Sequence, residues 1–69
     1  MDRLIMLGSV YEHFKGGKYK VLFLATDSIT NEEVVVYESL YGKHLIWTMP
    51  VDKFNSYTED GIERFKLVK

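Results

Sequence analysis

The residues best suited to acid–base or metal chemistry in this sequence are its two histidines, His13 and His44. They show neither HxH nor HExxH spacing, and without cysteine the chain has no recognisable set of metal ligands. The serines lie in no nucleophile elbow, and nucleophilic catalysis needs a base held beside the nucleophile. The sequence therefore predicts no catalytic residue, metal site or cofactor. One alternative stays open, a polar site made by His13 with Lys15 and the loop carboxylate Asp27.

Gly16 and Gly17, flanked by Lys15 and Lys18, have the composition of a phosphate-binding loop. Such a loop requires a helix directly after the glycines, because aligned amides at the helix N-terminus hold the anion. The apolar segment that follows, residues 18–26, has the pattern of a strand instead. Two consecutive glycines also suit the positive φ angles of a two-residue hairpin turn. We therefore expect a β-hairpin that turns at these glycines.

The aromatic residues are the other chemically informative group, since Tyr and Trp join an apolar ring to a polar tip and suit half-exposed grooves. Tyr11, His13 and Lys15 alternate along residues 9–15, which places them on one face of a strand. Each aromatic ring is also a candidate for the core, because a small domain without disulfides needs large side chains to fill it. The candidate partner-binding residues are Tyr11, His13, Lys15, Tyr37, Tyr41 and Trp47.

The length and charge of the chain limit the classes of partner. A chain of 69 residues is expected to form one domain, residues 1–69, that buries roughly 60% of its unfolded surface. Nine basic and ten acidic residues give a net charge of −1, without the basic excess typical of nucleic-acid binding. A protein or peptide partner is therefore favoured over nucleic acid. The sequence shows no long apolar segment, so we expect no membrane span and a cytoplasmic location.

The apolar pattern predicts five or six short strands, at residues 9–15, 18–26, 33–41, 45–49 and 61–68. Residues 1–7 show no clear period and form either a lead-in strand or a turn. Pro50 ends the fourth segment, and a short 3₁₀ turn is expected between it and the last strand. The predicted fold is all-β, a small SH3-like barrel of antiparallel strands.

The second segment is apolar on both sides, which predicts a central strand covered on both faces. Strict alternation assigns its side chains to two sets. One face is expected to carry Tyr19, Val21, Phe23 and Ala25, and the other Leu22 and Leu24.

Three ordered blocks of this sequence resemble the short bacterial proteins of domain-of-unknown-function family 1653. The blocks are YEHFKGGKYKVL at residues 11–22, VVYESLYG at 35–42, and WTMP at 47–50 followed by Phe54. The resemblance implies a small β domain and supplies no activity. Asp27 stands where the family tends to have histidine, and Met49 where it tends to have arginine. Any polar site that these two positions form with His13 in relatives is therefore altered or lost here.

The favoured function is a non-catalytic binding module that recognises a protein segment or nucleic acid through an aromatic groove. That groove is expected near Tyr11, His13, Tyr41 and Trp47. Two alternatives remain: a small enzyme or ligand-binding domain that uses His13, and a structural domain that forms a homodimer through an exposed strand edge.

Overall fold

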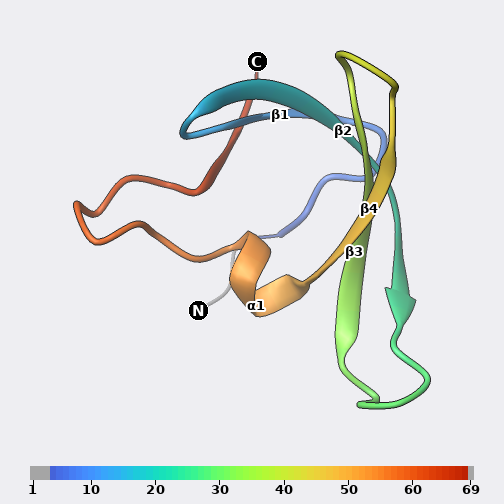
Figure 1. The fold of residues 1–69 in the computed structure, drawn as a ribbon. Coiled ribbons are helices and arrows are strands. Elements are labelled where there is room, and N and C mark those ends of the chain that lie inside the picture. Colours follow the sequence, from blue (N-terminus) through green and yellow to red (C-terminus); the bar gives the residue numbers. More distant parts are fainter. Residues whose placement is uncertain (1–3, 69) are drawn as a thin grey trace.

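A computed structural model describes residues 4–68 and contains one antiparallel sheet of five strands with a single helical turn (Figure 1). The all-β prediction is confirmed. Residues 4–7 form no strand, and residues 1–3 of the expected lead-in segment lie outside the described part of the chain. The elements are β1 (Val10–His13), β2 (Gly16–Thr26), β3 (Glu33–Ser39), β4 (Ile46–Pro50), α1 (Val51–Phe54) and β5 (Phe65–Leu67).

The sheet is open, which differs from the barrel expected from the sequence. Its strand order is β4-β3-β2-β1-β5, and the edge strands β4 and β5 do not pair with each other within residues 4–68. The chain leaves β4 directly into α1, whose Phe54 ring stacks on Phe65 of β5 at a centroid distance of 4.3 Å. Side-chain packing, rather than a ladder of backbone hydrogen bonds, therefore connects the two ends of the sheet.

The first hairpin turns at Phe14 and Lys15, two residues before the expected turn at the glycines. Gly16 pairs with His13 and Lys18 pairs with Glu12, so Gly17 is an extra residue that forms a β-bulge. Gly16 and Gly17 have φ angles of 109° and 49°, in the region that only glycine enters readily. The glycines therefore serve the bulge rather than the turn itself. A strand follows them, as expected, so the phosphate-loop interpretation has no support.

A second bulge in β2 reverses the alternation of its side chains. Val21 pairs with Tyr37 but Phe23 pairs with Val36, so Leu22 is the extra residue. Because each extra residue moves the following side chains to the opposite face, Phe23 leaves the face that Val21 occupies. The expected shared face of Tyr19, Val21, Phe23 and Ala25 is therefore wrong beyond Val21. Phe23 is 53% exposed on the outer face.

The core lies on the other face of the sheet, which we call the inner face. Tyr11, Val21, Val35, Tyr37, Phe54 and Phe65 form one buried cluster there. Most of its ring pairs meet edge to face, while Phe54 and Phe65 lie nearly parallel with an interplanar angle of 7°. The expected 3₁₀ turn is instead one turn of α-helix that begins after Pro50, and it carries Phe54 onto this face. Large rings thus fill the core of a domain without disulfides.

Candidate partner-binding site

Two of the six candidate residues, Tyr11 and Tyr37, belong to the core. Each retains only 6% of its exposure. The Tyr11 hydroxyl accepts a hydrogen bond of 3.0 Å from the backbone N–H of Met6, which holds the segment before β1 against the sheet. Burial raises the pKa of the Tyr37 hydroxyl. These two side chains stabilise the domain and offer little surface to a partner.

His13, at the end of β1, is half-buried among aromatic rings. Its centroid lies 4.5 Å from that of Phe14 and 4.9 Å from that of Phe65. The Lys15 backbone N–H donates to His13 Nδ1 at 3.2 Å, so the neutral ring carries its proton on Nε2. Burial lowers the pKa of His13, and the charges of Arg64 and Lys15 lower it further. His13 is therefore a neutral imidazole near pH 7, suited to packing and hydrogen bonding.

Asp27 lies at the opposite end of β2 from His13, because His13 pairs with Gly16 whereas Asp27 follows Thr26. Its Oδ1 accepts hydrogen bonds from the backbone N–H groups of Ile29 (2.8 Å) and Thr30 (3.1 Å), which closes the β2–β3 turn. These bonds, that of Ile29 foremost, lower the pKa of the Asp27 carboxyl. The polar site of His13, Lys15 and Asp27 considered above is not assembled.

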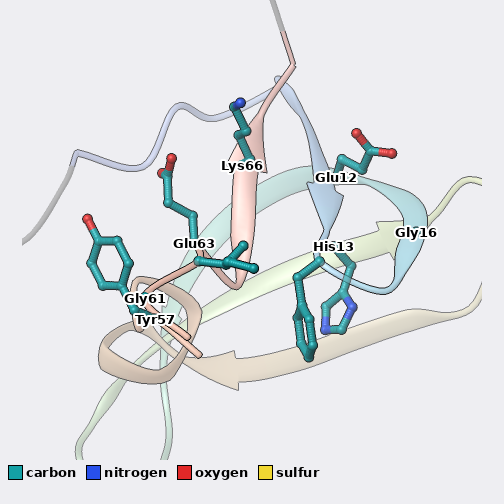
Figure 2. A pocket seen from close by; sticks show the side chains of 9 residues that line it. Glu12, His13, Gly16, Tyr57, Gly61, Glu63 and Lys66 are labelled. Atoms are coloured by element: carbon teal, nitrogen blue, oxygen red, sulfur yellow. The ribbon is translucent and has the colours of Figure 1, made fainter. Parts of the chain in front are cut away.

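A groove lies between the β1–β2 turn and the 57–63 loop, beside β5. It encloses about 620 Å³ and we call it the hairpin groove (Figure 2). It contains His13 together with three partly exposed apolar side chains, Phe14, Tyr57 and Ile62. The groove is lined by Glu12, His13, Phe14, Gly16, Tyr57, Gly61, Ile62, Glu63 and Lys66.

Backbone hydrogen bonds hold both walls of the hairpin groove. On one wall, the Phe14 N–H donates to the Arg64 carbonyl at 3.0 Å, and the Arg64 guanidinium lies 5.7 Å from the Phe14 ring centroid. On the other, the Thr58 N–H donates to the Ile62 carbonyl at 2.8 Å, and Tyr57 and Glu63 form a β-bridge. These backbone hydrogen bonds fix the positions of both walls relative to the sheet.

The charged side chains of the hairpin groove are of both signs. Glu12 pairs with Lys18 on β2 and with Lys66 on β5, so the carboxylate is placed between two lysines on the outer face. Figure 2 shows Lys66 between Glu12 and Glu63 along the groove. The hairpin groove therefore combines apolar side chains with charges of both signs.

Tyr41 occupies a separate surface next to the first bulge. Its hydroxyl and that of Tyr19 share a hydrogen bond of 2.6 Å, and their rings meet edge to face. This hydrogen bond, with burial and neighbouring tyrosines, raises the pKa of Tyr19 to about 12. The Tyr41 ring also covers Gly17. If Gly17 were replaced by a residue with a side chain, the new Cβ atom would lie 3.0 Å from Tyr41 Cε1. A second cavity of about 580 Å³ lies here, lined in part by Tyr41 and Gly17.

Trp47 lies on β4 at the far edge of the sheet from β1 and β5. It pairs with Tyr37 and keeps 46% of its exposure. Met49, on the same strand, packs against the core, so the position that tends to be arginine in the family carries an apolar contact here. Lys15 is exposed in the β1–β2 turn, so it does not share a strand face with Tyr11 and His13 as expected. The other five candidate residues divide among the core, the hairpin groove, the surface near Tyr41 and the β4 edge.

The sequence reasoning missed Phe14, Tyr57 and Ile62 as groove residues. Phe14 falls within the strand predicted at residues 9–15, whereas it lies in the turn. Tyr57 and Ile62 lie in a loop whose strand pattern is weak, and only tertiary structure brings this loop to the first hairpin. A large apolar residue next to a turn-forming glycine, as at Gly61-Ile62, indicates an apolar side chain that is exposed at a turn, and this pattern could have identified Ile62 from the sequence.

Within residues 4–68, no three His, Cys, Asp or Glu side chains are arranged to hold a metal ion. In the same part of the chain, no helix has the length and apolar character needed to cross a membrane.

Comparison with known families gives one match, to the family described as "Protein of unknown function (DUF1653)", over residues 9–67. The chain belongs to this family. The matched residues include all five strands, both bulges and every residue of the hairpin groove. The family resemblance noted in the sequence is thereby confirmed. No curated protein and no solved structure matches the chain.

Proposed function

We propose that this chain is a non-catalytic binding module that recognises an exposed segment of another protein in the hairpin groove. The observation that carries the proposal is the groove itself, about 620 Å³, between two turns held by backbone hydrogen bonds. Ligand sites commonly have volumes of about 300 to 1,000 Å³ and combine apolar walls with a few polar groups.

The side chains of the groove suggest what the segment carries. Phe14, Tyr57 and Ile62 offer an apolar seat for one large side chain. Glu12 and Glu63 favour a neighbouring basic residue, and Lys66 favours an acidic one. Nucleic acid is less well supported, because its phosphates would meet the two carboxylates.

The proposal is tested with ¹⁵N-labelled protein and short peptides that carry one leucine or phenylalanine flanked by lysine. A single-stranded oligonucleotide serves as the competing probe. We expect the peptide to shift the amide signals of Phe14, Gly16, Gly61 and Ile62. Shifts only from the oligonucleotide, or shifts confined to the β2–β3 turn, would contradict the proposal.

A pair of matched variants makes this test specific. Ile62 and Ile29 are both exposed isoleucines, at 54% and 89%, but only Ile62 lines the groove. Ile62→Glu is expected to abolish the peptide shifts and Ile29→Glu to leave them unchanged. Equal effects of the two substitutions would show that binding does not use the groove.

The SH3-like character of the domain remains a prediction. Five antiparallel strands and a helical turn before the last strand support it, whereas the open sheet differs from a closed barrel.

A further inference from the structure

The edge strand β4 lacks the features by which proteins usually protect an open edge. Residues 45–51, LIWTMPV, contain no charged side chain. Ile46 is 64% exposed, and Trp47 is exposed beside it. Edge strands are normally blunted by charges, bulges or a covering segment, because their unpaired backbone groups bind other strands. Pro50, at the end of the strand, is the only blunting residue that β4 contains.

The hydrogen-bond pattern shows which backbone groups of β4 face outward. The Ser39 N–H donates to the Leu45 carbonyl at 3.0 Å, so Leu45 points its backbone groups toward β3. In an antiparallel pair, alternate residues bond to the same neighbour. Trp47 and Met49 therefore also bond toward β3, and Ile46, Thr48 and Pro50 present their backbone groups to the free edge. Pro50 has no N–H, and its carbonyl accepts the first hydrogen bond of α1 as the N-cap of that helix. The edge thus offers the N–H donors and the carbonyl acceptors of Ile46 and Thr48.

The two ends of β4 differ in charge. Lys43 and His44 precede the strand and are exposed, and the Glu38 carboxylate lies 3.5 Å from His44 Nδ1. At the other end, Pro50 shares a small cavity of about 260 Å³ with three acidic residues, Glu32, Glu33 and Asp52. A strand laid antiparallel along β4 would be complemented best if it brought positive charge near Pro50. A second copy of β4 in antiparallel orientation meets this requirement, because its Lys43 precedes the end that approaches Pro50 of the first copy.

We propose that β4 pairs with β4 of a second copy of this chain, antiparallel about a two-fold axis at Thr48. The Thr48 N–H of each copy then donates to the Thr48 carbonyl of the other. Ile46 of each copy lies opposite Pro50 of the other, and the missing N–H of Pro50 breaks no bond within its own sheet. The self-complementary β4 edge makes a closed dimer, in which β4 of each copy is paired and β5 of each copy remains at an outer edge of the joined sheet.

The register follows from the residue before the strand. A two-fold axis at Trp47 would place Pro50 opposite His44 of the other copy. His44 has a φ of 53°, and its N–H already donates to the Tyr41 carbonyl at 3.2 Å. It cannot extend the strand, so only the axis at Thr48 pairs residues 46–50 of both copies along their full length.

The same register also buries the exposed apolar side chains. On the inner face, Trp47 of each copy lies opposite Met49 of the other, and sulfur–aromatic contacts are favourable. On the outer face, Ile46 lies opposite Pro50. The hairpin groove is at the far edge of the sheet and stays open in both copies. This inference does not rest on the function proposed for the groove.

The first test measures mass against protein concentration by sedimentation or light scattering. We expect the mass to rise from the 8.1 kDa of one chain to twice that value. Thr48→Lys should shift the protein to the monomer, because it places two like charges directly opposite each other at the axis. Thr26→Lys is the control, since Thr26 is also an exposed strand threonine but lies on β2, and it should still dimerise.

The second test detects the register by cross-linking, which is clean because the chain has no cysteine. Hydrogen-bonded antiparallel partners have Cα atoms about 5.5 Å apart, within the range that a disulfide spans. Thr48→Cys is therefore expected to cross-link on oxidation, whereas Thr26→Cys is not. A wild-type protein that is monomeric at every concentration would overturn the proposal. A dimer that Thr48→Lys leaves intact would do so too, as would a β4 edge that a different protein segment occupies instead.

Discussion

The two edge strands of this sheet both leave backbone groups unpaired, and they differ in how well those groups are protected. At one edge, β5 is three residues long, carries Lys66, and has the 57–63 loop beside it. At the other, β4 is five residues long, uncharged and exposed. The β5 edge is short and charged, which discourages pairing with another strand, and the hairpin groove lies beside it. The β4 edge has backbone groups to offer and is suited to a strand. The difference predicts two separate surfaces on one small domain.

The two edges nevertheless depend on a single core. α1 follows β4 without a break, and its Phe54 stacks on Phe65 of β5. Figure 1 shows α1 as a turn beside the sheet, between the strand that precedes it and the long connection to β5. Removing one ring of this pair should therefore destabilise both edges of the sheet together. A substitution near one edge should affect that edge alone.

The largest effect is expected from Phe54→Ala. Removing a buried aromatic ring costs about 3 to 5 kcal/mol of unfolding free energy, which is a large part of the stability of so small a domain. Phe23→Ala is the control, because that ring is 53% exposed and should cost far less. Chemical denaturation of both variants measures the difference. Similar losses would show that the stacked rings do not hold the two edges together.

The next effect is expected from Gly17→Ala. The residue has a φ of 49°, where a side chain costs about 1 to 2 kcal/mol, and its new Cβ would also meet the Tyr41 ring at 3.0 Å. Gly42→Ala is the matched control, because Gly42 has a φ of 59° with no atom near its Cβ. We expect Gly17→Ala to lower the unfolding free energy more than Gly42→Ala. Equal losses would mean that Tyr41 yields to the new methyl group without cost.

A smaller effect is expected from Tyr41→Phe, which removes the 2.6 Å hydrogen bond to Tyr19. The unfolding free energy should fall by about 0.5 kcal/mol, the low end for a hydrogen bond, because the pair is exposed. The pKa of Tyr19 should fall from about 12 toward its ordinary value of 10.0. Ultraviolet titration of tyrosinate measures this change, and Tyr57→Phe is the control that should leave Tyr19 unchanged.

The hydrogen bond between Tyr19 and Tyr41 also determines how the unfolding free energy changes at alkaline pH. The pKa of Tyr19 is raised in the folded protein, so its contribution to stability is complete below pH 10.0 and is lost as the pH rises toward about 12. Tyr41→Phe should weaken that slope. An unchanged slope would show that another group causes it.

The smallest change in unfolding free energy is expected from the protonation of His13 beside the hairpin groove. Its pKa is lowered below 6.5, so the unfolded chain takes up a proton before the folded protein does. The unfolding free energy should therefore fall as the pH drops below 6.5, until His13 in the folded protein is also protonated. An NMR titration gives the midpoint, and His13→Gln should remove this part of the slope while His44→Gln retains it. A midpoint at or above 6.5 would contradict the burial of His13.

The candidate site could be predicted only in part from the sequence. The sequence predicts His13 as a partner-binding residue, and His13 lines the hairpin groove, although Tyr11, Tyr41 and Trp47 do not. Phe14, Tyr57 and Ile62 were not, because their proximity depends on a loop that folds back beside the first hairpin. Tyr11 and Tyr37 carry the same side chain as Tyr41, and nothing local to them reveals that two are buried and one is exposed.

The sequence by itself determined the all-β class, the segments that form strands, the end of β4 at Pro50 and the uncharged character of that strand. These properties are local: side-chain alternation, β-branched residues and proline act within a few residues of themselves. Only the tertiary structure decided the two bulges, the face that Phe23 occupies, the open sheet and the joining of two turns into a groove. A one-residue bulge reverses every following side chain, and whether it forms depends on packing against distant strands.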